Sequence, residues 1–254
     1  MLRRFVMFTV AAAFIWPGAV VAQEMEEAEP MLMISSWKCD FGSVGAIDND
    51  WEAGGVSAAQ AAIADGHWYS AGVFYHDWGD EWNVNFWAVG ENVAHLIEGQ
   101  NASNDAYEAA AGADGGLDLW EHCSEHKDGF YQMGQGTDGA EDAPPGPEMA
   151  VSSWKCTDVG AVAEGWDSYT RAKAQAVVDA GQWSDAGVYY HAWAGEWNVN
   201  FYYMADDIES FLYGWATFLT SMEDDEDAPN LVDHCTEHKD GFYQFGETAT
   251  GASD

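Results

Sequence analysis

Basic residues are scarce in this chain of 254 residues, which has 8 lysines and arginines against 44 aspartates and glutamates. Arg3 and Arg4 lie in an N-terminal segment that we expect to be removed. The six remaining basic residues, against the same 44 acidic ones, leave a formal charge of −38. Nucleic-acid phosphates and anionic membrane surfaces both attract clustered lysine and arginine. The composition therefore excludes nucleic acids and anionic membrane surfaces as partners.

Long apolar runs are also lacking after residue 22, so the sequence predicts no membrane-spanning segment there. Residues 1–22 have the pattern of a secretory signal peptide. Arg3 and Arg4 precede an apolar stretch from Phe5 to Trp16, which is followed by the small-residue cleavage site Val20-Val21-Ala22. These 12 apolar residues are too few to cross a bilayer. We therefore predict cleavage near Ala22 and a secreted or periplasmic protein.

Three blocks of sequence occur twice in the same order, with offsets of 117, 115 and 112 residues. They are SSWKC from Ser35 and Ser152, EWNVNF from Glu81 and Glu196, and HCSEHKDGFYQ from His122 against HCTEHKDGFYQ from His234. A tandem repeat of this kind is typical of a duplicated structural unit. The predicted organisation is a signal peptide at 1–22, an acidic tail at 23–30, module one at 31–134, a linker at 135–148, module two at 149–247 and a tail at 248–254. Proline, glycine and acidic residues in the linker favour an irregular connection.

Cysteine is rare, and the four cysteines occupy equivalent positions in the two modules: Cys39 with Cys156, and Cys123 with Cys235. An exported protein is exposed to an environment that favours disulfides. Four cysteines allow three pairings. The repeat favours Cys39–Cys123 and Cys156–Cys235, with one bridge inside each module.

Each module has the same order of hydrophobic patterns. In module one we expect a strand at 31–37, a helix at 48–64, strands at 68–78 and 81–88, a helix at 91–98 and a strand at 127–133. The matching helices of module two are expected at 164–180 and 206–219. Gly66 and Gly181 are the expected stops of the first helix in each module.

This β-α-β-β-α-β order is that of the split ferredoxin-like unit. Two such units in one chain resemble the dimeric α/β-barrel superfamily. The resemblance implies an α+β fold in which two sheets pack face to face with the helices outside, here within one chain. The superfamily includes small monooxygenases, haem-degrading enzymes, isomerases, cyclases and stress proteins, so the fold alone does not decide the function.

The central hairpin of each module is expected to present one mixed polar and aromatic face, because side chains alternate along a strand. With Gly79-Asp80 as the loop, this face carries Gly72, Phe74, His76, Trp78, Glu81, Asn83, Asn85 and Trp87. Module two supplies Tyr189, His191, Trp193, Glu196, Asn198, Asn200 and Tyr202. The opposite face of module one is nearly all apolar and should pack on the helices, as with Val73, Val84 and Phe86. In a barrel, the mixed face would line the interior.

Convergent polar groups among aromatic side chains suit a small-molecule cavity. His76 and His191 are the predicted catalytic residues, as general bases or hydrogen-bond donors. The predicted ligand-binding residues are Trp78, Glu81, Asn83, Asn85, Tyr189, Trp193, Glu196, Asn198 and Asn200. The alternative is that these groups satisfy one another in a polar seam, or face water.

A metal site is a second interpretation. His122 and His126, and their copies His234 and His238, are spaced so that each pair would lie together on a helical turn. Glu125 and Glu237 lie between the members of the pairs. The alternative is a structural cap beside the disulfide.

The function that these patterns favour is small-molecule binding by an exported α/β barrel, with chemistry of the cofactor-independent monooxygenase or isomerase type. The sequence requires no cofactor and identifies none: it has no phosphate-binding glycine loop, nucleophile elbow or zinc-protease motif. A non-catalytic protein-interaction module and a metal- or haem-binding protein remain as alternatives. The ligand and the oligomeric state stay open.

Four lysines recur as the pairs Lys38/Lys155 and Lys127/Lys239, and we interpret them as ion-pair partners.

Overall fold

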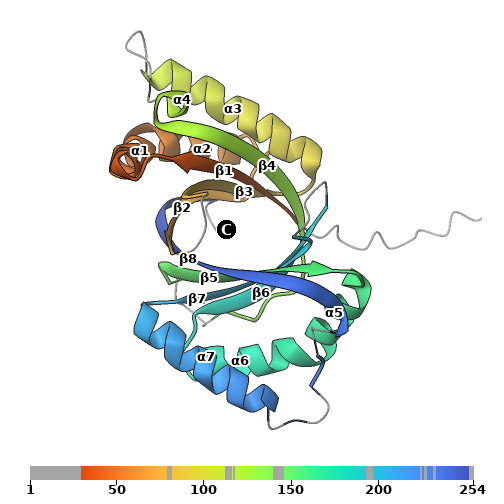
Figure 1. The fold of residues 1–254 in the computed structure, drawn as a ribbon. Coiled ribbons are helices and arrows are strands. Elements are labelled where there is room, and N and C mark those ends of the chain that lie inside the picture. The colour runs from red at the N-terminus through yellow and green to blue at the C-terminus, as the bar shows by residue number, and fades with distance from the viewer. Residues whose placement is uncertain are drawn as a thin grey trace, which may run out of the picture.

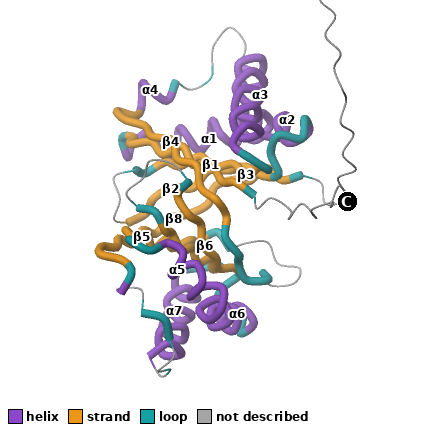
Figure 2. Tube along the Cα trace, turned by 90° about the vertical axis from the view of Figure 1, so that its right-hand side faces the viewer, coloured by secondary structure: helices purple, strands orange, loops and turns teal. Residues whose placement is uncertain are grey.

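A computed structural model describes residues 30–78, 82–111, 116, 118–139, 146–192, 197–223, 225, 228–230 and 233–251. These residues form a closed antiparallel barrel of eight strands with helices on two opposite sides (Figure 1). A view turned by 90° shows the same arrangement, with the strands between two groups of helices (Figure 2).

The two halves of the chain contain the same succession of elements. The first half comprises β1 (Met31–Cys39), a 3₁₀ turn (Phe41–Ser43), α1 (Val44–Asp50), a π-helical turn (Trp51–Gly55), α2 (Val56–Ala64), β2 (Ser70–Trp78), β3 (Val84–Gly90), α3 (Val93–Ala111), α4 (Leu119–His122) and β4 (Cys123–Met133). The second half comprises β5 (Glu148–Cys156), α5 (Val159–Gly165), a π-helical turn (Trp166–Thr170), α6 (Arg171–Asp179), β6 (Asp185–His191), β7 (Val199–Ala205), α7 (Ile208–Glu223) and β8 (Cys235–Thr250). The predicted element order is confirmed in both halves.

The strands follow one another around the barrel in the order β1-β3-β2-β8-β5-β7-β6-β4. Each half therefore contributes four adjacent strands, and the edges β2 and β4 of the first half pair with β8 and β6 of the second. The barrel closes within one chain. Because all neighbours are antiparallel, β1, β2, β5 and β6 run in one direction and the other four strands run in the opposite direction.

The first helical segment of each half is continuous but contains one π-helical turn, which begins at Trp51 or at Trp166. Both indoles reach across to the other half. Nε1 of Trp51 donates to the carbonyl of Glu247 over 2.8 Å, and Nε1 of Trp166 donates to that of Gln135 over 2.7 Å.

Gly66 and Gly181 end the first helical segment of each half, as predicted. Their φ angles are 78° and 69°, a conformation that glycine adopts without strain.

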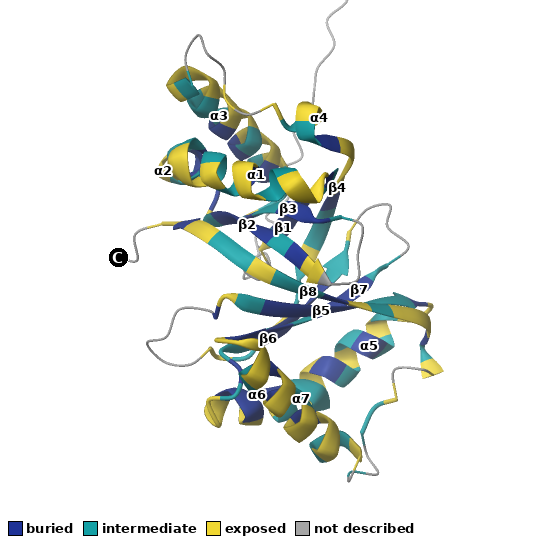
Figure 3. Ribbon diagram, turned by 60° about the vertical axis from the view of Figure 1, so that its left-hand side comes forward, coloured by how far each residue is buried: buried dark blue, intermediate teal, exposed yellow. Residues whose placement is uncertain are grey.

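Alternating side chains of the strands build separate cores on the two faces of the barrel wall. Outward residues such as Val73 and Val84 pack with the helical side, whereas inward residues such as Phe74 and Tyr189 pack together inside the barrel. The exposed residues of the helices lie mainly on their outer faces (Figure 3). The predicted assignment of the two hairpin faces in module one is therefore confirmed.

Both predicted disulfides are present, Cys39–Cys123 and Cys156–Cys235. They span 84 and 79 residues, so each contributes about 4–5 kcal/mol to stability in the chain-entropy model. The bridges are compatible with an oxidising extracellular or periplasmic environment.

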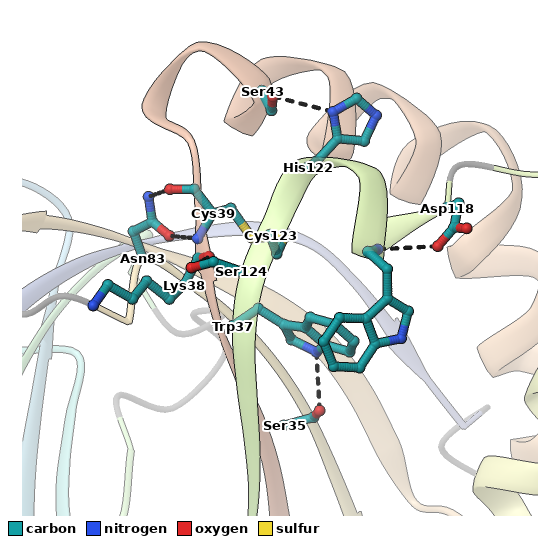
Figure 4. Close-up of a disulfide and its surroundings, with 11 residues drawn as sticks. Ser35, Trp37, Lys38, Cys39, Ser43, Asn83, Asp118, His122, Cys123 and Ser124 are labelled. Carbon is teal, nitrogen blue, oxygen red and sulfur yellow. Dashed lines mark hydrogen bonds between the residues drawn. A yellow bond between two sulfur atoms is a disulfide. The ribbon is translucent and has the colours of Figure 1, made fainter.

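An asparagine side chain continues the sheet beside each disulfide. The β1–β4 register shifts between Lys38 and Cys39, and the amide of Asn83 bonds there to both main-chain groups of Cys39. Its Oδ1 accepts from the Cys39 N–H and its Nδ2 donates to the Cys39 carbonyl, each over 2.8 Å (Figure 4). Asn198 makes the same two bonds, also of 2.8 Å, to Cys156. The two amides therefore replace a missing strand neighbour.

Some predicted boundaries are corrected. The helix expected at 91–98 extends from Val93 to Ala111, and the strand expected at 127–133 begins at Cys123. The tail expected at 248–254 is a strand as far as Thr250, because Thr248 to Thr250 pair with Gly72 to Ser70 of β2. None of the helices among the described residues has the length and apolarity needed to cross a membrane.

Removing the Asn83 amide tests its structural role. We expect Asn83→Ala to lower the free energy of unfolding by about 2–3 kcal/mol, because it leaves a buried N–H and C=O unsatisfied. The same loss is expected for Asn198→Ala. Asn49→Ala is the control, since Asn49 bonds to Gly45 at an exposed site. Urea unfolding measures all three, and equal stability of the Asn83 and Asn49 variants would contradict the role.

Candidate functional site

The register of the central hairpin agrees with its prediction. Phe74 pairs with Asn85 and Gly72 with Trp87, and the N–H of His76 donates to the carbonyl of Asn83 over 3.1 Å. The mixed face therefore turns into the barrel as expected. Glu81, Trp193 and Glu196 lie outside the described residues, and for Trp78 the structure describes the main chain alone.

His76 and His191 occupy equivalent positions inside the barrel. His76 is buried, and its ring meets that of Tyr243 edge to face at 4.8 Å. His191 is partly exposed and meets Tyr131 in the same way at 4.7 Å. Burial, and then the positive charge of Lys127, lower the pKa of His191, which favours its neutral form. Neither histidine lines the cavity inside the barrel or the pocket between strands and helices in either half. Their catalytic role therefore stays a prediction.

The four predicted asparagines divide into two pairs. The amides of Asn83 and Asn198 bond to the main chain of Cys39 and Cys156 beside the disulfides. These two side chains therefore have a structural role. Asn85 and Asn200 are buried inside the barrel, each 4% exposed. Nδ2 of Asn85 donates to the carbonyl of Trp82 over 3.1 Å, whereas Nδ2 of Asn200 has no hydrogen-bond partner among the described residues.

The helical spacing on which the metal prediction depended is absent. His122 ends α4 and β4 begins at Cys123, so His122 and His126 are separated by extended chain. Four residues of strand span about 13 Å, which is too far for two ligands of one ion. His234 and His238 have the same relation to β8, which begins at Cys235. The described residues contain no group of three metal-binding side chains.

The described residues line a cavity inside the barrel and, in each half, a pocket between the strands and the helices. The interior cavity has a volume of about 520 Å³, the first-half pocket about 480 Å³ and the second-half pocket about 290 Å³. The first-half pocket is lined on the strand side by residues that include Trp37, Phe86, His126, Asp128 and Phe130, and on the helix side by residues that include Asp50, Trp51, Gln100, Ser103, Asn104 and Tyr107.

The two outer pockets differ because their covering helices differ. Trp68 donates its Nε1–H to the carbonyl of Leu96 in α3, and Trp183 does the same to Phe211 in α7, which aligns the two helices with an offset of 115 residues. At that offset Gln100, Ser103, Asn104 and Tyr107 correspond to Trp215, Phe218, Leu219 and Met222. The second-half rings pack around Trp183. Large apolar side chains thus fill the space that small and polar ones leave open in the first half.

Polar groups face each other across the first-half pocket. On the helix side, the hydroxyl of Tyr107 donates to a carboxylate oxygen of Asp50. On the strand side, His126 stacks on Trp37 at 4.6 Å, and its Nε2 lies 3.6 Å from Oδ2 of Asp128. The Asp50–Tyr107 pair has no counterpart, because Gly165 and Met222 stand at the equivalent positions.

This pocket was not predicted, although the sequence carries a signal for it. The stretch from Asn101 to Asn104 is polar where the repeat copy, from Ala216 to Leu219, is mostly apolar. A polar replacement on the buried side of a repeated helix indicates that one copy has lost its packing role. Comparing the two modules position by position would therefore have found it.

No family model matches the chain, and no curated protein matches it in sequence. Several solved structures share its fold. A protein from Lactobacillus acidophilus that is named as a monooxygenase is 10% identical, with a TM-score of 0.60 over 87% of this chain and 96% of its own. Another so named, from Fusobacterium nucleatum, is 8% identical, with a TM-score of 0.57 over 88% and 95%. An anthrone oxidase-like protein is 14% identical, with a TM-score of 0.56 over 90% and 95%. The chain therefore has the α+β fold of the dimeric α/β-barrel superfamily.

Proposed function

We propose that this chain binds a flat, mostly apolar small molecule in the first-half pocket. The contrast between the two halves carries this proposal: equivalent positions hold Ser103 beside a pocket of about 480 Å³ and Phe218 beside a smaller one of about 290 Å³. A pocket of about 480 Å³ lies within the usual range for small-molecule sites. The first half lacks apolar packing that the second half has at the equivalent positions, a difference that ligand binding would account for.

The walls of the pocket suit an aromatic ligand. Trp37, Trp51 and Phe86 offer ring faces and edges, against which a planar molecule can stack. Polar groups lie at two places, the Asp50–Tyr107 pair on the helices and the His126–Asp128 pair on the strands. A ligand with one or two oxygen atoms on an aromatic frame would match this distribution.

The reaction that we propose is a cofactor-independent oxidation by O₂. Anthrone, a tricyclic ketone, is a suitable test substrate because one structural neighbour is named an anthrone oxidase-like protein. Loss of a proton from its ring methylene gives an enolate whose electrons pass to O₂. Overall, one anthrone and one O₂ give one anthraquinone and one water. His126 would accept the proton, since imidazole exchanges protons readily near neutral pH, and Asp128 would stabilise the resulting imidazolium.

We further infer that the two halves are ferredoxin-like modules from a tandem duplication. Both halves have the same element order and the same strand order within their four strands, and three sequence blocks recur. We also propose that residues 1–22 direct export and are then removed. The charged, apolar and small-residue regions of this segment support export, and the two disulfides are compatible with it.

Intact-mass spectrometry of the exported protein tests the export proposal. The expected chain begins at Gln23 and is four hydrogens lighter than the reduced form, because two disulfides have formed. A chain that retains Met1 to Ala22 would overturn cleavage of the leader.

Filling the first-half pocket tests the binding site. Ser103→Phe introduces the residue that the second half has at this position, and we expect it to weaken anthrone binding at least about tenfold, or about 1.4 kcal/mol. Ala109→Phe places the same ring on the exposed side of α3 and should leave binding unchanged. Isothermal titration under nitrogen measures the affinity without turnover. Equal affinities of the two variants would place the ligand elsewhere.

The duplication also supplies a control for the proposed base. We expect His126→Ala to lower kcat for anthrone oxidation by about 100-fold or more, with little change in affinity. His238→Ala should have no effect, although His238 stacks on Trp154 at 4.5 Å and pairs with Asp240 as His126 does with Asp128. Oxygen consumption and anthraquinone absorbance measure the rate. Unchanged turnover in the His126 variant would exclude this histidine as the base.

A further inference from the structure

The barrel interior contains a cavity that is separate from the first-half pocket. It has a volume of about 520 Å³, and Trp87 is the one described residue that lines both spaces. Most of its wall is apolar or aromatic, with Leu32, Phe74 and Met149 as examples. Both halves of the chain contribute to this wall, so the cavity exists because the barrel is closed.

Inward-facing glycines keep the centre of this cavity open. A Cβ atom on Gly72 would lie 2.8 Å from Nε1 of Trp87, and one on Gly187 would lie 2.6 Å from the ring of Tyr202. The two large rings therefore lie flat over the glycine main chain of the neighbouring strand. This arrangement lines the wall with ring faces and leaves space between the halves.

One carboxylate lines this space, from the second half of the chain. Asp185, at the position equivalent to Ser70, accepts from the hydroxyl of Thr137 over 2.9 Å and from that of Tyr202 over 3.2 Å. Burial raises the pKa of Asp185. Because a buried carboxylate is costly unless donors surround it, an amine or hydroxyl on a bound molecule would be stabilised there.

The cavity opens at the end of the barrel opposite to the two histidines. Ser70 begins β2 and Asp185 begins β6, whereas His76 and His191 lie near the ends of these strands. Because β2 and β6 run in the same direction, the starting residues lie at one mouth and the histidines towards the other. Thr248 and Thr250, both exposed, complete the mouth beside Ser70.

We infer that the barrel interior is a second small-molecule site, which takes a flat, mostly apolar molecule with an amine or hydroxyl donor for Asp185. Stacking on the rings of Trp87 and Tyr202 would supply most of the affinity. The carboxylate would fix one end of the ligand at the mouth beside Ser70. This site is independent of the function proposed for the first-half pocket.

The test uses 2-aminoanthracene, which has an amine on a flat aromatic frame, and anthracene, which has the frame alone. Binding is measured in the full chain with and without Ser103→Phe, which fills the first-half pocket. Equilibrium dialysis with absorbance detection is expected to show one bound 2-aminoanthracene per chain in the Ser103→Phe variant. Binding that disappears on Ser103→Phe would overturn the second site and leave the proposed function intact.

Asp185→Ala, made in the Ser103→Phe chain, then removes the carboxylate. We expect it to weaken 2-aminoanthracene binding about five- to tenfold and to leave anthracene binding nearly unchanged, because anthracene has no donor. An equal effect on both probes would overturn the predicted hydrogen bond. Val89→Phe, which narrows the cavity, should abolish binding of both probes. It also serves as the second variant if Asp185→Ala does not fold, and unchanged binding in it would exclude the interior as the site.

Discussion

The fold depends on the pairing of sheet edges between the two halves. A four-stranded sheet with the order β4-β1-β3-β2 leaves main-chain donors and acceptors of β4 and β2 unpaired, and its inward face is apolar. Isolated, such a sheet would expose both. In the closed barrel β2 pairs with β8 and β4 pairs with β6, and the apolar faces cover each other. The reciprocal bonds of Trp51 and Trp166 strengthen the same two seams.

Closure of the barrel leaves one interior cavity that both halves line and one outer pocket in each half. The interior is shared, so a change on one inward strand alters the packing of both halves. The outer pockets belong to one half each, and one can open while the other preserves stability. The rings of Trp183, Trp215 and Phe218 pack together in the second half and leave a pocket of about 290 Å³, whereas Ser103 lies beside a pocket of about 480 Å³ at the equivalent place in the first. The interior packing thus ties the halves together, while the outer packing differs between them.

The features that depend on local alternation could be predicted from the sequence. Phe74 and Trp87 face inward because side chains alternate along paired strands, and the disulfides follow from the positions of the cysteines in the repeat. Features set by tertiary pairing could not. His122 and His126 look helical by spacing, but pairing of β4 with β1 from Cys123 onward extends the chain between them. Residues 248–250 look like a tail because their partner strand lies about 180 positions earlier in the sequence.

Four of the six basic residues beyond residue 22 lie at one mouth of the barrel. Lys38 and Lys155 lie near the ends of β1 and β5, and Lys127 and Lys239 lie near the starts of the antiparallel strands β4 and β8. Lys38 pairs with Glu125 at 3.6 Å and Lys155 with Glu237 at 3.1 Å, as the ion-pair interpretation expected. Lys127 also lies over the Trp82 ring at 4.3 Å, and Lys155 over that of Trp197 at 4.5 Å. Exposed ion pairs alone stabilise little, but a cation over an indole also shields apolar surface from water. Lys239, the repeat copy of Lys127, also lies near the Trp197 ring, at 5.3 Å, so a lysine at the equivalent position covers the corresponding tryptophan in each half.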